Sequence, residues 1–245
     1  MGQTYPNTMK NFPSRIQVRI GFLVLSLTCV LPVVNASETI PGKIAISAIP
    51  GELTILNTPT QVRLEKDGSL YLAAPGKTNL FNPPAGSASV QSAPMVLFEA
   101  PKAGFVLMAK VSGSLKEVYD VAALVVYQDN NTWAKLCYEN SVAKEPTIVS
   151  VVTRTISDDC NSQSIASDHA FLAIARKGSV YTFNYSPDGK NWRMIRHFNL
   201  ATTGKLMAGF AVHDSRGEGF AATFSQITYI PEAPESVGNL PPITQ

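Results

Sequence analysis

Short apolar or alternating runs recur along the chain from residue 44 onward, and each ends at Gly, Pro, Asn or Asp. No segment keeps a 3.6-residue apolar period for three turns, so long helices are not expected. Runs of this length separated by turn residues are typical of antiparallel sandwiches and barrels. The sequence therefore predicts an all-β protein with strands at 52–56, 61–65, 69–73, 95–99, 105–111, 121–128, 133–139, 147–155, 170–176, 180–185, 192–198, 206–212 and 220–230.

The charge content limits the classes of partner. Only 16% of the 245 residues are charged and the net charge is +2, whereas soluble domains usually carry about 25% charged residues. No basic run is interleaved with aromatic residues. A nucleic-acid partner is therefore not expected.

The N-terminus has the pattern of a targeting segment. Lys10, Arg15 and Arg19 precede an apolar run over residues 20–34, and small residues follow at Ala36 and Ser37. A basic region, an apolar region and small residues in this order predict a secretory signal peptide over residues 1–36. The alternative is a retained anchor, although the run is shorter than the roughly 20 residues of a spanning helix. We expect a secreted or periplasmic protein with no membrane span after cleavage.

The remaining chain is expected to form one domain over residues 37–230. A Pro- and Gly-rich stretch at 74–94 is predicted to be a long loop inside this domain, and such loops are often functional. Residues 231–245 contain little apolar surface and several prolines, so we expect a disordered tail.

Cysteine usage suggests a covalent link. Removal of the signal peptide would leave Cys137 and Cys160, and an even pair in an oxidising compartment predicts a disulfide. The alternative is two unpaired thiols. No Cys/His cluster indicates a metal site, although Asp129, Asn130, Asp158 and Asp159 could supply oxygen ligands to calcium. The three histidines are scattered, and we expect them to be structural or surface residues.

The strand at 133–139 carries the best candidate chemistry. A period of two places Ala134, Leu136 and Tyr138 on one face, toward a core, and four residues on the other. This second face carries an aromatic ring, a cation, a thiol and a carboxylate, from Trp133, Lys135, Cys137 and Glu139. It forms either a binding site or a solvated surface with an ordinary ion pair.

Ordered sequence pieces resemble a bacterial domain family of unknown function, often labelled regulation-of-enolase-like. They are LFNP at 80–83, FVLMAKVSG at 105–113, WAK at 133–135 with Glu139, VVTR at 151–154, SD at 157–158, YSPDGKNWRMIR at 185–196 and GFAATF at 219–224. The chain departs from the family pattern at Asn79, where an acidic residue is usual, and at Asp159 and Cys160. The resemblance implies a two-sheet jelly-roll sandwich of concanavalin A-like or laminin G-like type.

These observations favour a non-catalytic module that recognises a carbohydrate or cell-envelope glycan on a concave sheet. The expected ligand-binding residues are Trp133, Lys135, Glu139, Arg154 and Asp158. No catalytic residue is assigned, because the paired-acid strand motif of glycanases with this fold is missing. The alternatives are a glycan-acting hydrolase, and a structural or adhesion module that binds another protein.

Overall fold

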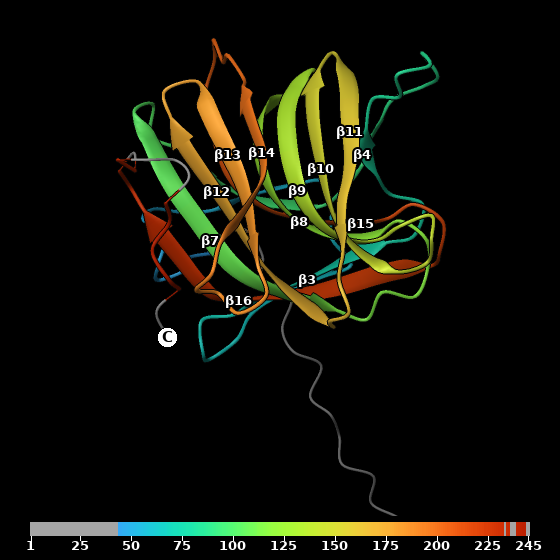
Figure 1. The fold of residues 1–245 in the computed structure, drawn as a ribbon. Coiled ribbons are helices and arrows are strands. Elements are labelled where there is room, and N and C mark those ends of the chain that lie inside the picture. Colours follow the sequence, from blue (N-terminus) through green and yellow to red (C-terminus); the bar gives the residue numbers. More distant parts are fainter. Residues whose placement is uncertain (1–43, 233, 236–238, 244–245) are drawn as a thin grey trace, which may run out of the picture. The chain divides into compact units, whose positions relative to one another are not determined.

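Two seven-stranded antiparallel sheets pack face to face in the structure, a computed structural model that describes residues 44–232, 234–235 and 239–243 (Figure 1). The first sheet has the order β1 (Thr54–Leu56), β6 (Met95–Glu99), β15 (Met207–Asp214), β8 (Asp120–Asp129), β9 (Thr132–Asn140), β10 (Pro146–Arg154) and β11 (Ile156–Ser164). The second has the order β14 (Arg193–Asn199), β13 (Val180–Ser186), β12 (His169–Lys177), β7 (Gly104–Gly113), β16 (Gly219–Ile230), β3 (Leu70–Pro75) and β2 (Gln61–Leu64). The predicted all-β sandwich is confirmed.

A third, two-stranded ribbon lies within the long loop that the sequence predicted at 74–94. It consists of β4 (Leu80–Phe81) and β5 (Val90–Gln91), and Figure 1 shows β4 beside β11 at the edge of the first sheet. The sequence did not predict β4, β5 or β11. β11 reads ISDDCNSQS and is mostly exposed, so it lacks the apolar alternation by which strands are recognised.

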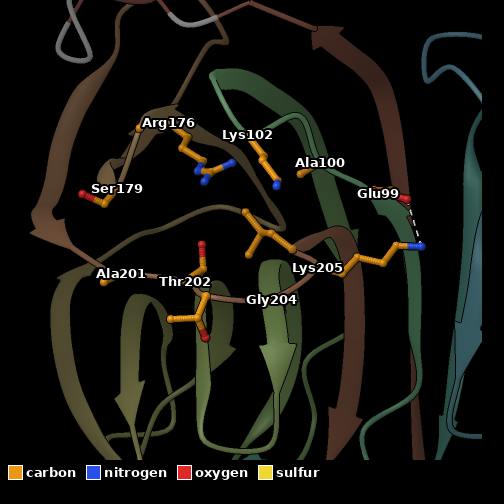
Figure 2. Close-up of a pocket in the computed structure, with 12 residues that line it drawn as sticks. Glu99, Ala100, Lys102, Arg176, Ser179, Ala201, Thr202, Gly204 and Lys205 are labelled. Carbon is orange, nitrogen blue, oxygen red and sulfur yellow. Dashed lines mark ion pairs between the residues drawn. The ribbon is translucent and has the colours of Figure 1, made fainter.

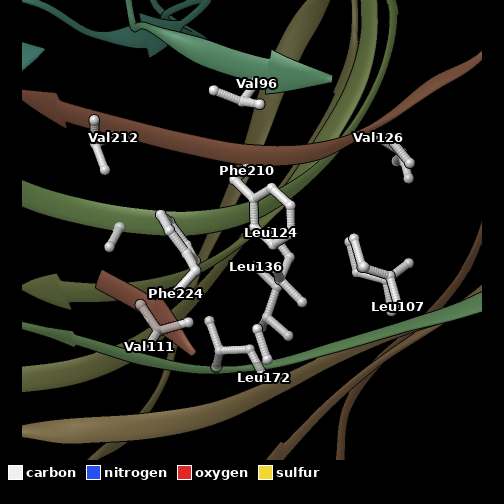
Figure 3. Close-up of a cluster of buried hydrophobic side chains, with 14 of the residues drawn as sticks. Val96, Leu107, Val111, Leu124, Val126, Leu136, Leu172, Phe210, Val212 and Phe224 are labelled. Atoms are coloured by element: carbon white, nitrogen blue, oxygen red, sulfur yellow. The ribbon is translucent and has the colours of Figure 1, made fainter. Parts of the chain in front are cut away.

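The hydrophobic core lies between the two sheets (Figure 3). Phe210 of β15 and Phe224 of β16 meet across the interface, with ring centroids 5.0 Å apart. Leu124, Leu136 and Leu172 are fully buried in the same cluster. Because alternate residues of each strand face this layer, the inward set reads as apolar at every second position.

The predicted disulfide is wrong. Cys137 and Cys160 are both free, the first buried and the second exposed. Cys137 is paired with Val149 on β10 and Cys160 with Ser150, and adjacent residues of a strand point to opposite faces. The two thiols therefore lie on opposite faces of the sheet with β10 between them. Two strand spacings are roughly 9–10 Å, beyond the roughly 7 Å Cα separation that a disulfide allows.

Part of the C-terminal segment packs on the second sheet. Leu240 and Ile243 are buried with Met108 and Phe171 on the face turned away from the core. Trp192 Nε1 donates a hydrogen bond to the Pro241 carbonyl at 2.9 Å. The expectation of an unpacked tail over residues 231–245 is therefore not met at Leu240 and Ile243.

The predicted signal peptide, residues 1–36, lies outside the described residues. Within the part of the chain that the structure describes, no helix is long and apolar enough to cross a membrane.

Candidate functional site

Strand β9 divides its side chains between two layers as its sequence predicts. Ala134, Leu136 and Tyr138 face the second sheet in the main core. Trp133 and Cys137 belong to a separate apolar cluster on the outer face of the first sheet. This outer face is covered rather than solvated, because Leu80 and Phe81 from the long loop pack onto the same cluster.

The loop is fastened to the sheet by Asn82. Its Nδ2 donates to the carbonyls of Asn130 and Thr155 at 2.9 and 2.8 Å. Its backbone N–H donates to Ser157 Oγ at 2.9 Å, and the Ser157 N–H donates back to the Asn82 carbonyl at 2.8 Å. Ser157 Oγ also contacts Thr153 Oγ at 2.9 Å. This buried network positions the loop so that Phe81 lies over the outer face.

A pocket of about 170 Å³ remains between the loop and the outer face. We call it the Lys135 pocket. Four strands of the first sheet (β9, β10, β11 and β15), the loop and the segments that flank β8 and β15 contribute to it. Its lining consists of Asn79, Phe81, Tyr119, Lys135, Glu139, Val151, Asp159, His213 and Ser215.

Lys135 and His213 are in direct contact in this pocket. Lys135 Nζ lies 2.9 Å from His213 Nε2, and both side chains are buried. Burial and the Lys135 charge together hold the pKa of His213 well below its usual value of 6.5. The imidazole is therefore neutral and accepts a hydrogen bond from the ammonium at Nε2, which assigns its proton to Nδ1, 3.5 Å from Ser215 Oγ.

Two carboxyl groups share the pocket with this pair. Burial raises the pKa of Glu139 to about 7, against an opposing effect of Lys135 and with a further increase from Asp159. Burial also raises the pKa of Asp159, although Lys135 and Arg196 oppose the change. Glu139 thus exists in both protonation states near neutral pH, and it can either donate or accept a hydrogen bond.

Aromatic side chains form two walls of the Lys135 pocket. Phe81 and Tyr119 are both half-buried. Tyr119 has a φ of 70°, an unusual conformation for a residue with an aromatic side chain. Its N–H donates to the Asn140 carbonyl at 2.8 Å, and the Arg216 guanidinium lies 4.9 Å from its ring centroid. Strained backbone of this kind persists only where neighbouring contacts hold it, and it is concentrated at functional sites.

The structure brings together only part of the predicted ligand-binding set. Lys135 and Glu139 line the pocket. Trp133 is fully buried and its Nε1 donates to the Asn130 carbonyl at 3.3 Å, so its ring is packing rather than an open stacking surface.

Arg154 and Asp158 connect the first sheet to β14. Arg154 Nη2 donates to the Asn199 carbonyl, and Asp158 forms an ion pair with Arg196 at 2.8 Å. Asp158 is paired with Val152, which is a core residue, whereas Asp159 is paired with Val151 of the outer face. Asp159, not Asp158, is therefore the acid that reaches the Lys135 pocket.

Several lining residues were not recognised in the sequence. Tyr119, His213 and Ser215 are remote from β9 in the chain and belong to no motif with it. His213 was expected to be structural, yet it contacts the pocket lysine. The one available signal was Asn79, which occupies a position where the resembled family usually has an acid.

Two of the four suggested calcium ligands, Asp129 and Asp158, have other partners. Asp129 accepts hydrogen bonds from Asn131 N and Gln128 Nε2 at 2.8 Å each, and Asp158 is paired with Arg196. In residues 44–232 and the described C-terminal pieces, no group of three His, Cys, Asp or Glu side chains could hold a metal ion.

A family model described as "Protein of unknown function (DUF1349)" matches residues 55–232. The chain belongs to this family. The DUF1349 match begins within β1 and runs past the end of β16, and so includes every residue of the Lys135 pocket. A comparison with curated proteins gives no match.

Solved structures show the same fold. A functionally unknown protein from Saccharomyces cerevisiae is 24% identical, with 75% of this chain and 97% of that chain covered and a TM-score of 0.68. The GH43 protein BlXynB from Bacillus licheniformis is 20% identical (67% and 33% covered, TM-score 0.56), and a xylan beta-1,4-xylosidase from Bacillus halodurans is 17% identical (69% and 34% covered, TM-score 0.54). This DUF1349 chain therefore corresponds to about a third of each of the two Bacillus proteins.

Proposed function

We propose that the chain recognises a carbohydrate, and that one sugar ring occupies the Lys135 pocket. The observation that carries this proposal is the composition of the pocket, which combines a cation, two carboxyl groups and two aromatic walls in about 170 Å³. Sites for drug-sized ligands usually measure about 300–1,000 Å³, so this pocket suits one compact polar ring.

The polar groups match the chemistry of sugar hydroxyls. Each hydroxyl both donates and accepts hydrogen bonds, so it can accept from Lys135 Nζ and donate to the Asp159 or Glu139 carboxylate. Hydrogen bonds to charged groups are roughly twice as strong as neutral ones. Phe81 and Tyr119 supply apolar surface for the C–H face of the ring.

The setting of the fold agrees with this assignment. Two of the structurally similar proteins are a GH43 protein and a xylosidase, and the shared sandwich is part of their chains. From the basic and apolar pattern of residues 1–36, we also propose that the chain acts outside the cytoplasm, on an envelope or extracellular glycan.

Binding of the full-length chain to a glycan array, followed by titration calorimetry with the best ligand, tests the proposal. Phe81→Ala should weaken binding by about tenfold or more, because loss of an aromatic wall removes more than about 1.4 kcal/mol. Tyr71→Ala is the matched control, since Tyr71 is half-buried on β3 of the other sheet. Absence of glycan binding, or equal loss in both variants, would contradict the proposal.

A second candidate function is hydrolysis of a glycan. It is favoured by Glu139, whose pKa of about 7 suits a general acid at neutral pH, with Asp159 as the second carboxyl group. Glycosidases require two such groups. Release of reducing ends from a bound glycan, abolished by Glu139→Gln, would establish this activity. Binding without turnover would leave recognition as the function.

A further inference from the structure

A second hollow lies at one end of the sandwich, and it shares no lining residue with the Lys135 pocket. We call it the end pocket. It measures about 340 Å³ and forms where the β6–β7, β12–β13 and β14–β15 connections meet. Its lining consists of Glu99, Ala100, Lys102, Arg176, Gly178, Ser179, Ala201, Thr202, Thr203, Gly204, Lys205 and Leu206.

Arg176 is the buried centre of the end pocket. It follows Leu172 and Ile174 on the inward face of β12, and only 5% of its surface is exposed. Nη1 donates to the Pro101 carbonyl at 2.6 Å, but the buried Nε has no hydrogen-bond partner. Within the described residues, no carboxylate forms an ion pair with this guanidinium. A buried cation without a counter-charge is costly.

A second cation approaches from the opposite side. Figure 2 shows Arg176 and Lys102 extending toward each other into the hollow. Lys102 is exposed and has no ion pair or hydrogen bond to any described residue. Lys205 differs, because its Nζ points to Glu99 and pairs with Oε2 at 2.9 Å (Figure 2). Two unpaired positive charges therefore converge, and they repel each other unless an anion lies between them.

We propose that the end pocket binds an oxyanion group, such as sulfate, phosphate or carboxylate, between Arg176 and Lys102. The Arg176 guanidinium lines the hollow and would donate from an N–H group other than the one bonded to Pro101, while Lys102 adds a mobile charge. Ser179 Oγ accepts a hydrogen bond from Asn199 Nδ2 at 2.8 Å, which leaves its hydroxyl proton free to donate to the same anion. The volume of the hollow leaves room for the molecule that carries the oxyanion.

Titration calorimetry of the full chain with sodium sulfate, potassium phosphate and sodium acetate, at constant ionic strength set with sodium chloride, tests this proposal. We expect saturable binding of at least one ion at millimolar concentration. Lys102→Gln should weaken it about tenfold, the loss expected from one charge-assisted contact. Lys102 is exposed, so this variant does not threaten folding. Lys66→Gln, an equal charge change in the β2–β3 turn, should change affinity less than twofold.

Two further arms complete the test. Dextran sulfate compared with neutral dextran shows whether the oxyanion is recognised on a polysaccharide or only as a free ion, and binding in either arm supports the proposal if Lys102→Gln weakens it. Absence of saturable binding of all three ions and of dextran sulfate would overturn the proposal. Equal weakening by Lys102→Gln and Lys66→Gln would also overturn it, because the attraction would then be a property of net charge alone.

Discussion

The two faces of strand β9 are equally inaccessible but chemically different. Toward the second sheet, Leu136 and Tyr138 lie in an apolar core. Toward the long loop, Lys135 and Glu139 are 3% and 7% exposed, and they lie among apolar neighbours such as Trp133. Burial of the apolar inner face stabilises the fold. Burial of charges on the outer face destabilises it unless those charges are paired with a protein group or a ligand.

This difference separates folding from function within one strand. The inner face can be maintained by any well-packed set of hydrophobic residues. The outer face retains a lysine, two acids and a histidine around a pocket, which is the arrangement expected where recognition requires polar groups held in a partly dry site. Four substitutions examine this division, beginning with the largest expected effect.

Trp133→Ala should destabilise the chain about as much as a core mutation, although it lies on the outer face. Trp133 is fully buried, and truncation of a buried Trp usually costs about 3–5 kcal/mol. The free energy of unfolding from urea titration measures the loss. Met194→Ala, at a side chain that is 59% exposed, is the control and should change little. A cost for Trp133→Ala as small as that of the control would show that the outer face is open.

Glu139→Gln should gain stability relative to wild type as the pH rises from 5 to 8. The pKa of Glu139 is about 7 in the folded chain against 4.5 in its ordinary state, so the folded state binds more protons between these values. The stabilising contribution of the protonated Glu139 carboxyl group is fully present below pH 4.5. It is lost as pH rises through 7, and the loss amounts to about 3 kcal/mol. The variant lacks this loss, and the difference in unfolding free energy between wild type and variant should change by that amount.

The comparison with the variant is needed because the protonation of neighbouring groups also makes stability depend on pH. Asp159 has a raised pKa, so its contribution to stability also falls as pH rises. His213 has a lowered pKa, so its contribution to stability rises with pH below 6.5. The Lys135 charge lies close to all of these groups. If the difference in unfolding free energy between wild type and variant does not change with pH, burial does not raise the pKa of Glu139.

Asn82→Ala should loosen the loop that covers the outer face and cost about 1–3 kcal/mol, the usual penalty for leaving buried hydrogen-bond partners unsatisfied. Amide hydrogen exchange should show faster exchange at Ser157, whose N–H donates to the Asn82 carbonyl, and unchanged exchange in β12. Asn161→Ala on the exposed strand β11 is the matched control. If both variants exchange alike, Asn82 does not fasten the loop.

Cys160→Ser should have the smallest effect, because Cys160 is exposed and unpaired. The melting temperature should stay within about 1 °C of wild type, with or without a reducing agent, since exposed substitutions usually change stability by less than about 0.5 kcal/mol. A disulfide to Cys137 would instead make its removal cost roughly 3 kcal/mol. A destabilisation of that size on Cys160→Ser would show that the predicted disulfide forms.

The alternation of β9 could be read from sequence because Ala134, Leu136 and Tyr138 recur at every second position, with the charged Lys135 between the first two. The same argument failed at β11, where polar residues occupy both faces of an edge strand and provide no period. A register shift opposite Ile148 and Val149 lies in the same strand pair. Asp158 and Asp159 were therefore indistinguishable in sequence, although only one reaches the pocket.

Other features depended on contacts remote in the chain. His213 reaches Lys135 because β15 and β9 both flank β8, a strand order that no local pattern encodes. Burial of the outer face depends on Asn82 holding the loop, so Trp133 could not be distinguished from an exposed ring. The family resemblance, in contrast, rested on motifs spread through the domain, and the DUF1349 match confirms membership of a family of unknown function.

The most direct test of the central claim compares two adjacent acids. Calorimetry with the best array glycan should show that Asp159→Asn weakens binding by about tenfold or more, because the variant removes a charge-assisted hydrogen bond in the Lys135 pocket. Asp158→Asn should leave affinity within about twofold, since Asp158 pairs with Arg196 away from the pocket. The reverse order of effects, or equal losses, would contradict the assignment of the outer face as the ligand site.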